Sequence, residues 1–239
     1  VGLPEACVRE SAARVRAAIA AVGQRFPDRR VTISLAPAGL RKSGAGFDLP
    51  IAVGILAAGD GFESESLAGR AFVGELALDG RLRPVPGVLA MALAARDAGC
   101  REVVVPAACA ASAALAPGIR VLAAHDLAAV LAHLHGGDAL VAAQCPALGP
   151  GSAACACLSE VRGQEGAKRA LEIAAAGGHA LLLSGPPGSG KTMLARRLPG
   201  LLPPLGFEEA LEATRVHGAA GLLGENTAIV SERPFRAPH

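Results

Sequence analysis

The sequence predicts a mixed fold of two units in series, an α+β domain followed by the first part of an α/β nucleotide-binding domain. Residues 1–135 alternate short apolar runs typical of strands with alanine-rich runs typical of helices. Residues 136–157 are rich in Gly, Ala, Pro and Cys, a composition that favours a linker. Residues 158–239 contain a glycine-rich loop between an apolar run and a helical run. We therefore place the first domain at 1–135, the linker at 136–157 and the second domain at 158–239.

Each element of the first domain follows from its local pattern. Asp48 is expected to cap a helix, because Asp is a favoured N-cap residue and Pro50 fits a first helical turn. The dipeptide Asp79-Gly80 is typical of the two-residue turn of a β-hairpin. Helices are expected at 10–22, 48–58, 88–98 and 126–135, and strands at 31–35, 71–78, 81–85, 102–106 and 119–122.

The glycine-rich loop matches the phosphate-binding pattern G-x-x-x-x-G-K-[ST]. An apolar run at 180–184 predicts the buried strand that precedes such a loop, and residues 193–198 predict the helix that follows it. The glycines let backbone N–H groups turn toward phosphates, while Lys191 would reach the β- and γ-phosphates and Thr192 would hold Mg²⁺. The predicted loop residues are Gly185, Pro186, Pro187, Gly188, Ser189, Gly190, Lys191 and Thr192. The sequence therefore predicts a nucleoside triphosphate site.

Composition limits the other classes of function. The formal net charge is only +2 and there is no Trp or Tyr, so composition indicates neither a strongly basic surface nor an aromatic base-stacking platform. The most apolar stretches are interrupted before the roughly 20 residues that a membrane-spanning helix needs, and we expect no membrane partner. The 6 cysteines lack metal-ligand spacing; we expect unpaired thiols in a reducing cytoplasm, with a metal site as the alternative. The chain starts with Val1 rather than Met, so we expect it to be part of a longer protein.

The first domain resembles the S5-like fold of the Lon protease C-terminal domain, through its Asp79-Gly80 hairpin and the helix–strand unit that follows. In the Lon pattern the nucleophilic Ser lies in P-S-A-G-[IV]-A, and the corresponding stretch here places Asp48 at that position. The Lys of the Lon dyad corresponds to Met91. An Asp–Met pair has neither a hydroxyl nucleophile nor an amine base. The resemblance therefore implies a domain that is not a protease and has a binding or assembly role.

A wider resemblance extends over essentially the whole chain. The stretches that carry it are residues 1–4, 35–38, 47–52, 74–80, 161–164, 170–179, 185–194 and 233–239. Together they resemble the ComM/YifB family of magnesium-chelatase-like AAA+ ATPases. Ala180 departs from the family, which more often has Asn after Gly-Gly-His. The family's chain also continues into an acidic Walker B strand, sensors and an Arg finger, which are not among these 239 residues.

The resemblance implies an ATP hydrolase that uses ATP and Mg²⁺, works in the cytoplasm and forms a ring-shaped homo-oligomer, a hexamer in this family. It also places Val161 and Gln164 beside the adenine, although a polar cap at a helix start explains the same residues. Without a Walker B acid, we expect this segment to hydrolyse ATP poorly. In the ComM branch the motor drives branch migration on DNA during recombination and natural transformation. The alternatives are a magnesium-chelatase-type remodeller of a protein partner and a chaperone or protease accessory.

Several polar residues near the end of the chain keep more than one interpretation. Residues 207–213 predict a short acidic helix. Arg233, Arg236 and His239 fit contacts to a DNA backbone, contacts between subunits, or hydrogen bonds to buried carbonyls. His217 is expected in a turn or cap. A solvated helix face is expected for His125, His133 and His135.

Overall fold

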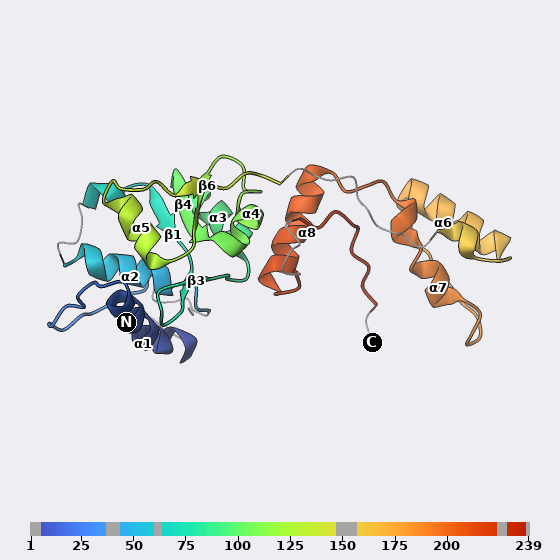
Figure 1. The fold of residues 1–239 in the computed structure, drawn as a ribbon. Coiled ribbons are helices and arrows are strands. Elements are labelled where there is room, and N and C mark those ends of the chain that lie inside the picture. Colours follow the sequence, from blue (N-terminus) through green and yellow to red (C-terminus); the bar gives the residue numbers. More distant parts are fainter. Residues whose placement is uncertain (1–5, 37–43, 60–63, 147–156, 224–228, 238–239) are drawn as a thin grey trace. The chain divides into compact units, whose positions relative to one another are not determined.

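The computed structural model describes residues 6–36, 44–59, 64–146, 157–223 and 229–237 (Figure 1). The chain divides into two compact units, which are Val1–Pro146 with Thr214–Ala228, and Ala147–Ala213 with Ile229–His239. Among the described residues, no helix is both long and apolar enough to cross a bilayer. The described thiols that are free are those of Cys100, Cys109, Cys145 and Cys157. The side chains of Cys7 and Cys155 lie outside the described part of the chain.

A four-stranded sheet in the order β1-β4-β5-β6 forms the centre of the first unit (Figure 1). Its strands are β1 (Arg70–Phe72), β4 (Glu102–Pro106), β5 (Arg120–Ala124) and β6 (Val141–Ala142). The first three are parallel, and β6 pairs with β5 in the antiparallel sense. Three consecutive valines of β4 are fully buried, as expected for a central parallel strand that is covered on both faces. The fold is thus a mixed α/β arrangement around a mainly parallel sheet.

A second sheet of two strands forms the hairpin predicted at Asp79-Gly80. In this sheet β2 (Glu75–Leu76) pairs with β3 (Leu82–Arg83) in the antiparallel sense. The φ of Gly80 is +87°, a left-handed conformation that glycine adopts without strain. The strands are shorter than predicted, because the first apolar run is divided at Gly74, where the chain leaves the main sheet and enters the hairpin.

Helices pack against the sheet and supply much of the core. The helices of this unit are α1 (Ala6–Ala21), α2 (Asp48–Ala57), α3 (Val88–Asp97), α4 (Ala110–Ala113) and α5 (Leu127–Leu134), with short 3-10 turns η1 (Ser64–Leu67) and η2 (Ala107–Cys109). The core that α1, α2 and α5 share with the strands includes the fully buried Ile19, Leu49 and Leu122. Burial of each such side chain contributes roughly 1.5–3 kcal/mol. The carboxylate of Asp126 caps α5 by accepting from the backbone N–H of Ala129 at 2.8 Å.

The segment at 31–35, which the sequence predicts to be a strand, is irregular. It pairs with no strand in the described part of the chain, and Val31 is 36% exposed. A β-branched run becomes a strand only where a neighbour satisfies its backbone N–H and C=O groups. The strand prediction is therefore wrong.

The second unit begins with helical elements. They are η3 (Leu158–Glu160), α6 (Glu165–Gly177), α7 (Lys191–Ala195) and η4 (Leu198–Leu201), followed by the first part of α8 (Phe207–Ala219), whose residues from Thr214 onward belong to the first unit. A small apolar core joins Val161, Leu171 and Leu194. The last helix extends six residues beyond the predicted 207–213, so His217 lies in its final turn rather than in a cap.

No strand forms at 180–184 in the described structure, contrary to the sequence prediction. The segment is irregular, and its Leu182 is 91% exposed. A parallel strand needs a paired neighbour, and none of the described segments pairs with this one. The helix after the loop begins at Lys191, earlier than the predicted start at residue 193, so the last two loop residues open it.

His133 on α5 is half-buried, which corrects the expectation of a solvated side chain. Its Nδ1 accepts a hydrogen bond from the backbone N–H of Leu140 at 3.3 Å, so the proton lies on Nε2. This Nε2 is buried without a hydrogen-bond partner among the described residues. Burial, followed by the charges of Arg70 and Arg120, lowers the pKa of His133, and Glu102 opposes this shift.

We expect His133 to reduce the stability of the protein in mildly acidic solution. The pKa of this imidazole is lower in the folded chain than its value of about 6.5 in an unfolded chain. Its contribution to stability is therefore complete above about pH 6.5 and is lost as the pH falls through the folded pKa. In His133→Gln, the urea midpoint should change less between about pH 7.5 and about pH 5.5 than in the wild type. His135→Gln, on the exposed end of the same helix, is the control; an unchanged pH dependence in His133→Gln would contradict the assignment.

Candidate nucleotide-binding site

The loop at 185–192 is a tight turn that ends on the first residues of α7. Gly188 and Gly190 have φ of +80° and +85°, in the left-handed region that glycine adopts without strain. The backbone N–H of Ser189 donates to the carbonyl of Pro186 at 3.3 Å and closes the turn. Backbone geometry alone therefore requires glycine at two positions of the motif.

The ammonium group of Lys191 lies against the loop. Its Nζ donates to the carbonyl oxygens of Gly185 and Pro186, both at 2.8 Å, and lies 3.3 Å from the hydroxyl of Ser189. These acceptors are neutral, whereas a phosphate oxygen is charged, and charge-assisted hydrogen bonds are roughly twice as strong as neutral ones. The ammonium group of Lys191 is thus positioned to exchange its hydrogen bonds to the carbonyls of Gly185 and Pro186 for hydrogen bonds to phosphate oxygens.

Thr192 follows as the second residue of α7, with an exposed side chain. Its hydroxyl is the type of hard oxygen ligand that Mg²⁺ accepts at a phosphate-binding loop. Backbone N–H groups, one ammonium and one hydroxyl together form a donor set that fits the phosphates of a magnesium nucleotide. The chemistry of these residues therefore agrees with the predicted ligand.

Gln164 lies against the same loop. It is the residue before α6, and its Nε2 donates to the carbonyl of Ser189 at 3.4 Å. The side chain makes no cap hydrogen bond with the helix, so the interpretation as a simple polar cap is wrong. Among the described residues other than glycine, only Gln164 has a positive φ, at 59°. Such a conformation costs about 1–2 kcal/mol for a side chain that carries a Cβ.

Val161 is 1% exposed and packs with Leu171 and Leu194 in the small core. Its side chain supports the segment that carries Gln164, and the contact with adenine stays a prediction for both residues. Gln164 thus contacts the loop through a hydrogen bond, whereas Val161 lies in the core beside Leu194 of α7.

Arg197, which the sequence analysis does not single out, connects the start of this unit to the loop helix. Its Nη2 lies 2.8 Å from Glu160 Oε2, and its Nε and Nη1 donate to the carbonyls of Cys157 and Met193 at 3.0 and 2.9 Å. The side chain is 12% exposed. Because Arg197 and Glu160 are 37 positions apart, no local sequence pattern reveals the contact.

Arg233 hydrogen-bonds within its own unit. Its Nε donates to the carbonyl of Pro203 at 2.7 Å, and its Nη2 lies 3.0 Å from Glu209 Oε2. The backbone N–H of Gly206, together with the charge of Arg233, lowers the pKa of Glu209. Pro203 is exposed, so its carbonyl is not the buried acceptor that the sequence analysis considered for Arg233. Contacts of Arg233 to a DNA backbone or to another subunit stay predictions. Arg236 is exposed, and His239 lies outside the described residues.

Asp48, which the sequence predicts to be a helix cap, is not one. The N-cap of α2 is Phe47, and Asp48 is the first helical residue, with 0% exposure. The cap prediction fails because tertiary partners, rather than the first N–H groups of the helix, satisfy this carboxylate. The neighbouring dyad position, Met91, is 38% exposed.

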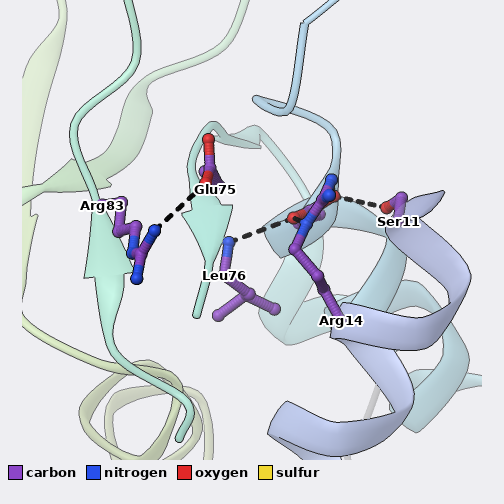
Figure 2. Close-up of polar contacts among 6 residues, drawn as sticks. Ser11, Arg14, Glu75, Leu76 and Arg83 are labelled. Atoms are coloured by element: carbon purple, nitrogen blue, oxygen red, sulfur yellow. Dashed lines mark hydrogen bonds and ion pairs between the residues drawn. The ribbon is translucent and has the colours of Figure 1, made fainter. Parts of the chain in front are cut away.

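Three partners satisfy the carboxylate of Asp48 (Figure 2). Arg14 donates from Nε to Oδ2 at 2.7 Å and from Nη2 to Oδ1 at 3.1 Å. The hydroxyl of Ser11 donates to Oδ1, and the backbone N–H of Leu76 donates to Oδ2 at 3.2 Å. Hydrogen bonding to Asp48 is the main reason why the pKa of Arg14 is raised. The carboxylate thus joins α1, α2 and β2.

Two family profiles match this chain, one in its N-terminal part and one in its C-terminal part. A family profile described as subunit ChlI of Mg-chelatase matches residues 1–109, and one described as magnesium chelatase, subunit ChlI, matches residues 157–239. The chain is 47% identical over 241 residues to the uncharacterized protein YifB of Salmonella typhimurium, and 46% identical over 240 residues to an uncharacterized protein of Mycobacterium tuberculosis. It is 44% identical over 246 residues to the competence protein ComM of Haemophilus influenzae.

These matches cover 100% of the chain and 47% of each relative, so the chain spans about half the length of the curated relatives it matches. The loop and the mixed α/β fold place the protein among magnesium-chelatase-type proteins with a phosphate-binding loop. More particularly, the chain belongs to the magnesium-chelatase-like family of AAA+ ATPases that contains YifB and ComM.

We expect loss of the Asp48 carboxylate to destabilise the protein strongly. In Asp48→Ala the guanidinium of Arg14, which is 21% exposed, and the backbone N–H of Leu76 lose their acceptor. Removing one partner of a buried ion pair costs about 3–5 kcal/mol, so the free energy of unfolding measured with urea should fall by about 3 kcal/mol. The control is Asp97→Ala, because Asp97 pairs with Arg96 on the surface of α3 and should contribute less than about 1 kcal/mol. Equal effects of the two substitutions would contradict the role given to Asp48.

Proposed function

We propose that this protein binds and hydrolyses MgATP and acts as an AAA+ motor on branched DNA. The observation that carries ATP binding is the position of Lys191, whose ammonium group lies 2.8 Å from two carbonyls of the loop that would surround the phosphates. Membership in a family of AAA+ ATPases supports the same ligand. The nucleotide site comprises the loop Gly185 to Thr192, together with Val161 and Gln164.

The residues present divide the work of phosphate binding. Lys191 would leave the carbonyls of Gly185 and Pro186 for the β- and γ-phosphates, and the backbone N–H groups of the loop would hold the remaining oxygens. Thr192 would be the protein ligand of Mg²⁺, which when bound neutralises charge on the phosphates. Hydrolysis further needs an acidic residue and an arginine near the γ-phosphate. The loop residues do not supply these, so the loop by itself supports binding rather than turnover.

A DNA substrate is supported by the relationship to ComM of Haemophilus influenzae, which is named a competence protein. Integration of incoming DNA by recombination proceeds through exchange of strands between DNA molecules. We therefore propose that the whole protein forms a ring-shaped homo-oligomer, a hexamer, that drives branch migration in the cytoplasm during recombination and natural transformation. The domains would be an S5-like module at 1–135 and the start of the AAA+ domain at 158–239. The predicted linker at 136–157 would be shorter than the sequence suggests, because β6 within it pairs with β5 of the first unit.

The second candidate is an ATPase that remodels a protein partner, as a magnesium-chelatase subunit or a chaperone or protease accessory. The profile match to the ChlI subunit favours this alternative. Proteolysis itself is not part of the proposal, because Asp48 is fully buried and paired with Arg14, and Met91 cannot act as a base. The first unit then has a binding or assembly role.

Substitution of Lys191 tests the nucleotide site. Lys191→Ala removes the one ammonium group at the loop, and charge-assisted contacts to phosphate are strong, so affinity for ATP should fall by about 100-fold. The matched control is Lys168→Ala, because Lys168 pairs with Glu165 at 3.0 Å on α6 and should leave the Kd within about twofold. Fluorescent-nucleotide titration measures both. Affinity equal to that of the wild type in Lys191→Ala would refute the site.

Stimulation of ATP hydrolysis separates the two candidate substrates. If DNA is the substrate, four-way junctions should raise the ATPase rate of the full-length protein by about tenfold or more, and Lys191→Ala should abolish the increase. Stimulation by an unfolded polypeptide but not by junctions would instead favour the remodelling of a protein partner. Linear duplex DNA of the same length and sequence is the control for branch specificity.

A further inference from the structure

Ser189, in the middle of the phosphate-binding loop, is held from two sides. Its carbonyl accepts from Gln164 Nε2 at 3.4 Å, and its hydroxyl lies 3.3 Å from Lys191 Nζ. The residue also donates its backbone N–H to the carbonyl of Pro186 at 3.3 Å. Of the two side chains that hold it, only Lys191 is expected to move to the nucleotide.

The backbone at Gln164 shows why this side chain reaches the loop. Gly163 and Gln164 have φ of +66° and 59°, so two consecutive left-handed residues turn the chain between Val161 and α6. Val161 is anchored in the core at 1% exposure, which fixes the start of this turn. In the left-handed conformation the side chain of Gln164 makes no cap contact with α6 and instead reaches Ser189.

We infer that Gln164 is a positioning residue for the phosphate-binding loop, which acts through the carbonyl of Ser189 and does not select the base of the nucleotide. This inference rests on the proposed nucleotide site. When a triphosphate draws Lys191 away from Gly185, Pro186 and Ser189, the bond from Gln164 remains and keeps the loop in the shape that phosphate requires. Gln164 therefore contributes equally to the binding of every ligand that carries a triphosphate.

The two possible roles of Gln164, recognition of adenine and positioning of the loop, predict different changes in ligand affinity when its amide is removed. Inorganic tripolyphosphate has the phosphates without a base, and GTP has the same phosphates with a different base. Loss of an amide that recognises adenine weakens the binding of ATP but not the binding of GTP or tripolyphosphate. Loss of a loop-positioning amide weakens ATP, GTP and tripolyphosphate by the same factor, because all three use the same loop.

The decisive variant is Gln164→Gly in the full-length protein. Glycine adopts the left-handed backbone without strain, so this change removes the amide while the melting temperature stays equal or rises. The expected result is a three- to tenfold higher Kd for ATP, GTP and tripolyphosphate, each with Mg²⁺, which corresponds to about 1 kcal/mol for one hydrogen bond. Gln164→Asn, which keeps an amide and tolerates the same backbone, should recover part of the affinity. Glu172→Gln, a change on the surface of the same helix where Glu172 pairs with Arg169, should leave all three Kd values unchanged.

Two results would overturn the inference. One is a higher Kd for ATP with an unchanged Kd for tripolyphosphate, which would make Gln164 a base-reading residue. The other is no change for any ligand in Gln164→Gly. Failure of the proposed function is a separate result, in which the wild type binds neither ATP nor tripolyphosphate, or Lys191→Ala binds them as the wild type does.

Discussion

The carboxylate of Asp48 carries a negative charge at a position with no exposure to solvent, and the first unit is built around the groups that satisfy it. Ser11 and Arg14 approach it from α1, and the backbone N–H of Leu76 approaches it from β2. A buried charge without partners costs several kcal/mol. The start of α2 can therefore be buried only when α1 and the hairpin are both in place, which couples three segments that are distant in sequence.

The same hydrogen bonds determine what the carboxylate of Asp48 can do. Both carboxylate oxygens of Asp48 accept hydrogen bonds from donors on α1 and β2. A buried, fully hydrogen-bonded carboxylate of this kind contributes to stability rather than to reactivity. A binding or assembly role for this unit is compatible with such an arrangement.

The second unit combines a small core, which joins Val161, Leu171 and Leu194, with polar contacts between its segments. Lys191 and Gln164 hydrogen-bond to the loop, and Arg197 ties the start of the unit to the helix after the loop. Polar contacts of this kind can be exchanged for contacts with a ligand at little cost, because each hydrogen bond contributes only about 1 kcal/mol net. The loop is thus shaped without a ligand, and its contacts can be exchanged for those of the proposed nucleotide.

The sequence by itself determined the features that local chemistry specifies. The glycine-rich loop and the Asp79-Gly80 hairpin each depend on residues within a few positions of one another. A short motif of this kind leaves the backbone few alternatives, so the pattern predicts the geometry.

Only the tertiary structure decided which partners distant residues would find. The apolar runs at 31–35 and 180–184 lack a described neighbour to pair with and stay irregular. Asp48 was predicted to cap a helix and instead pairs with Arg14. His133 was predicted to be solvated and is half-buried. Strand pairing, ion pairing and burial all depend on segments brought together by folding, and their energies are not encoded in any window of neighbouring residues.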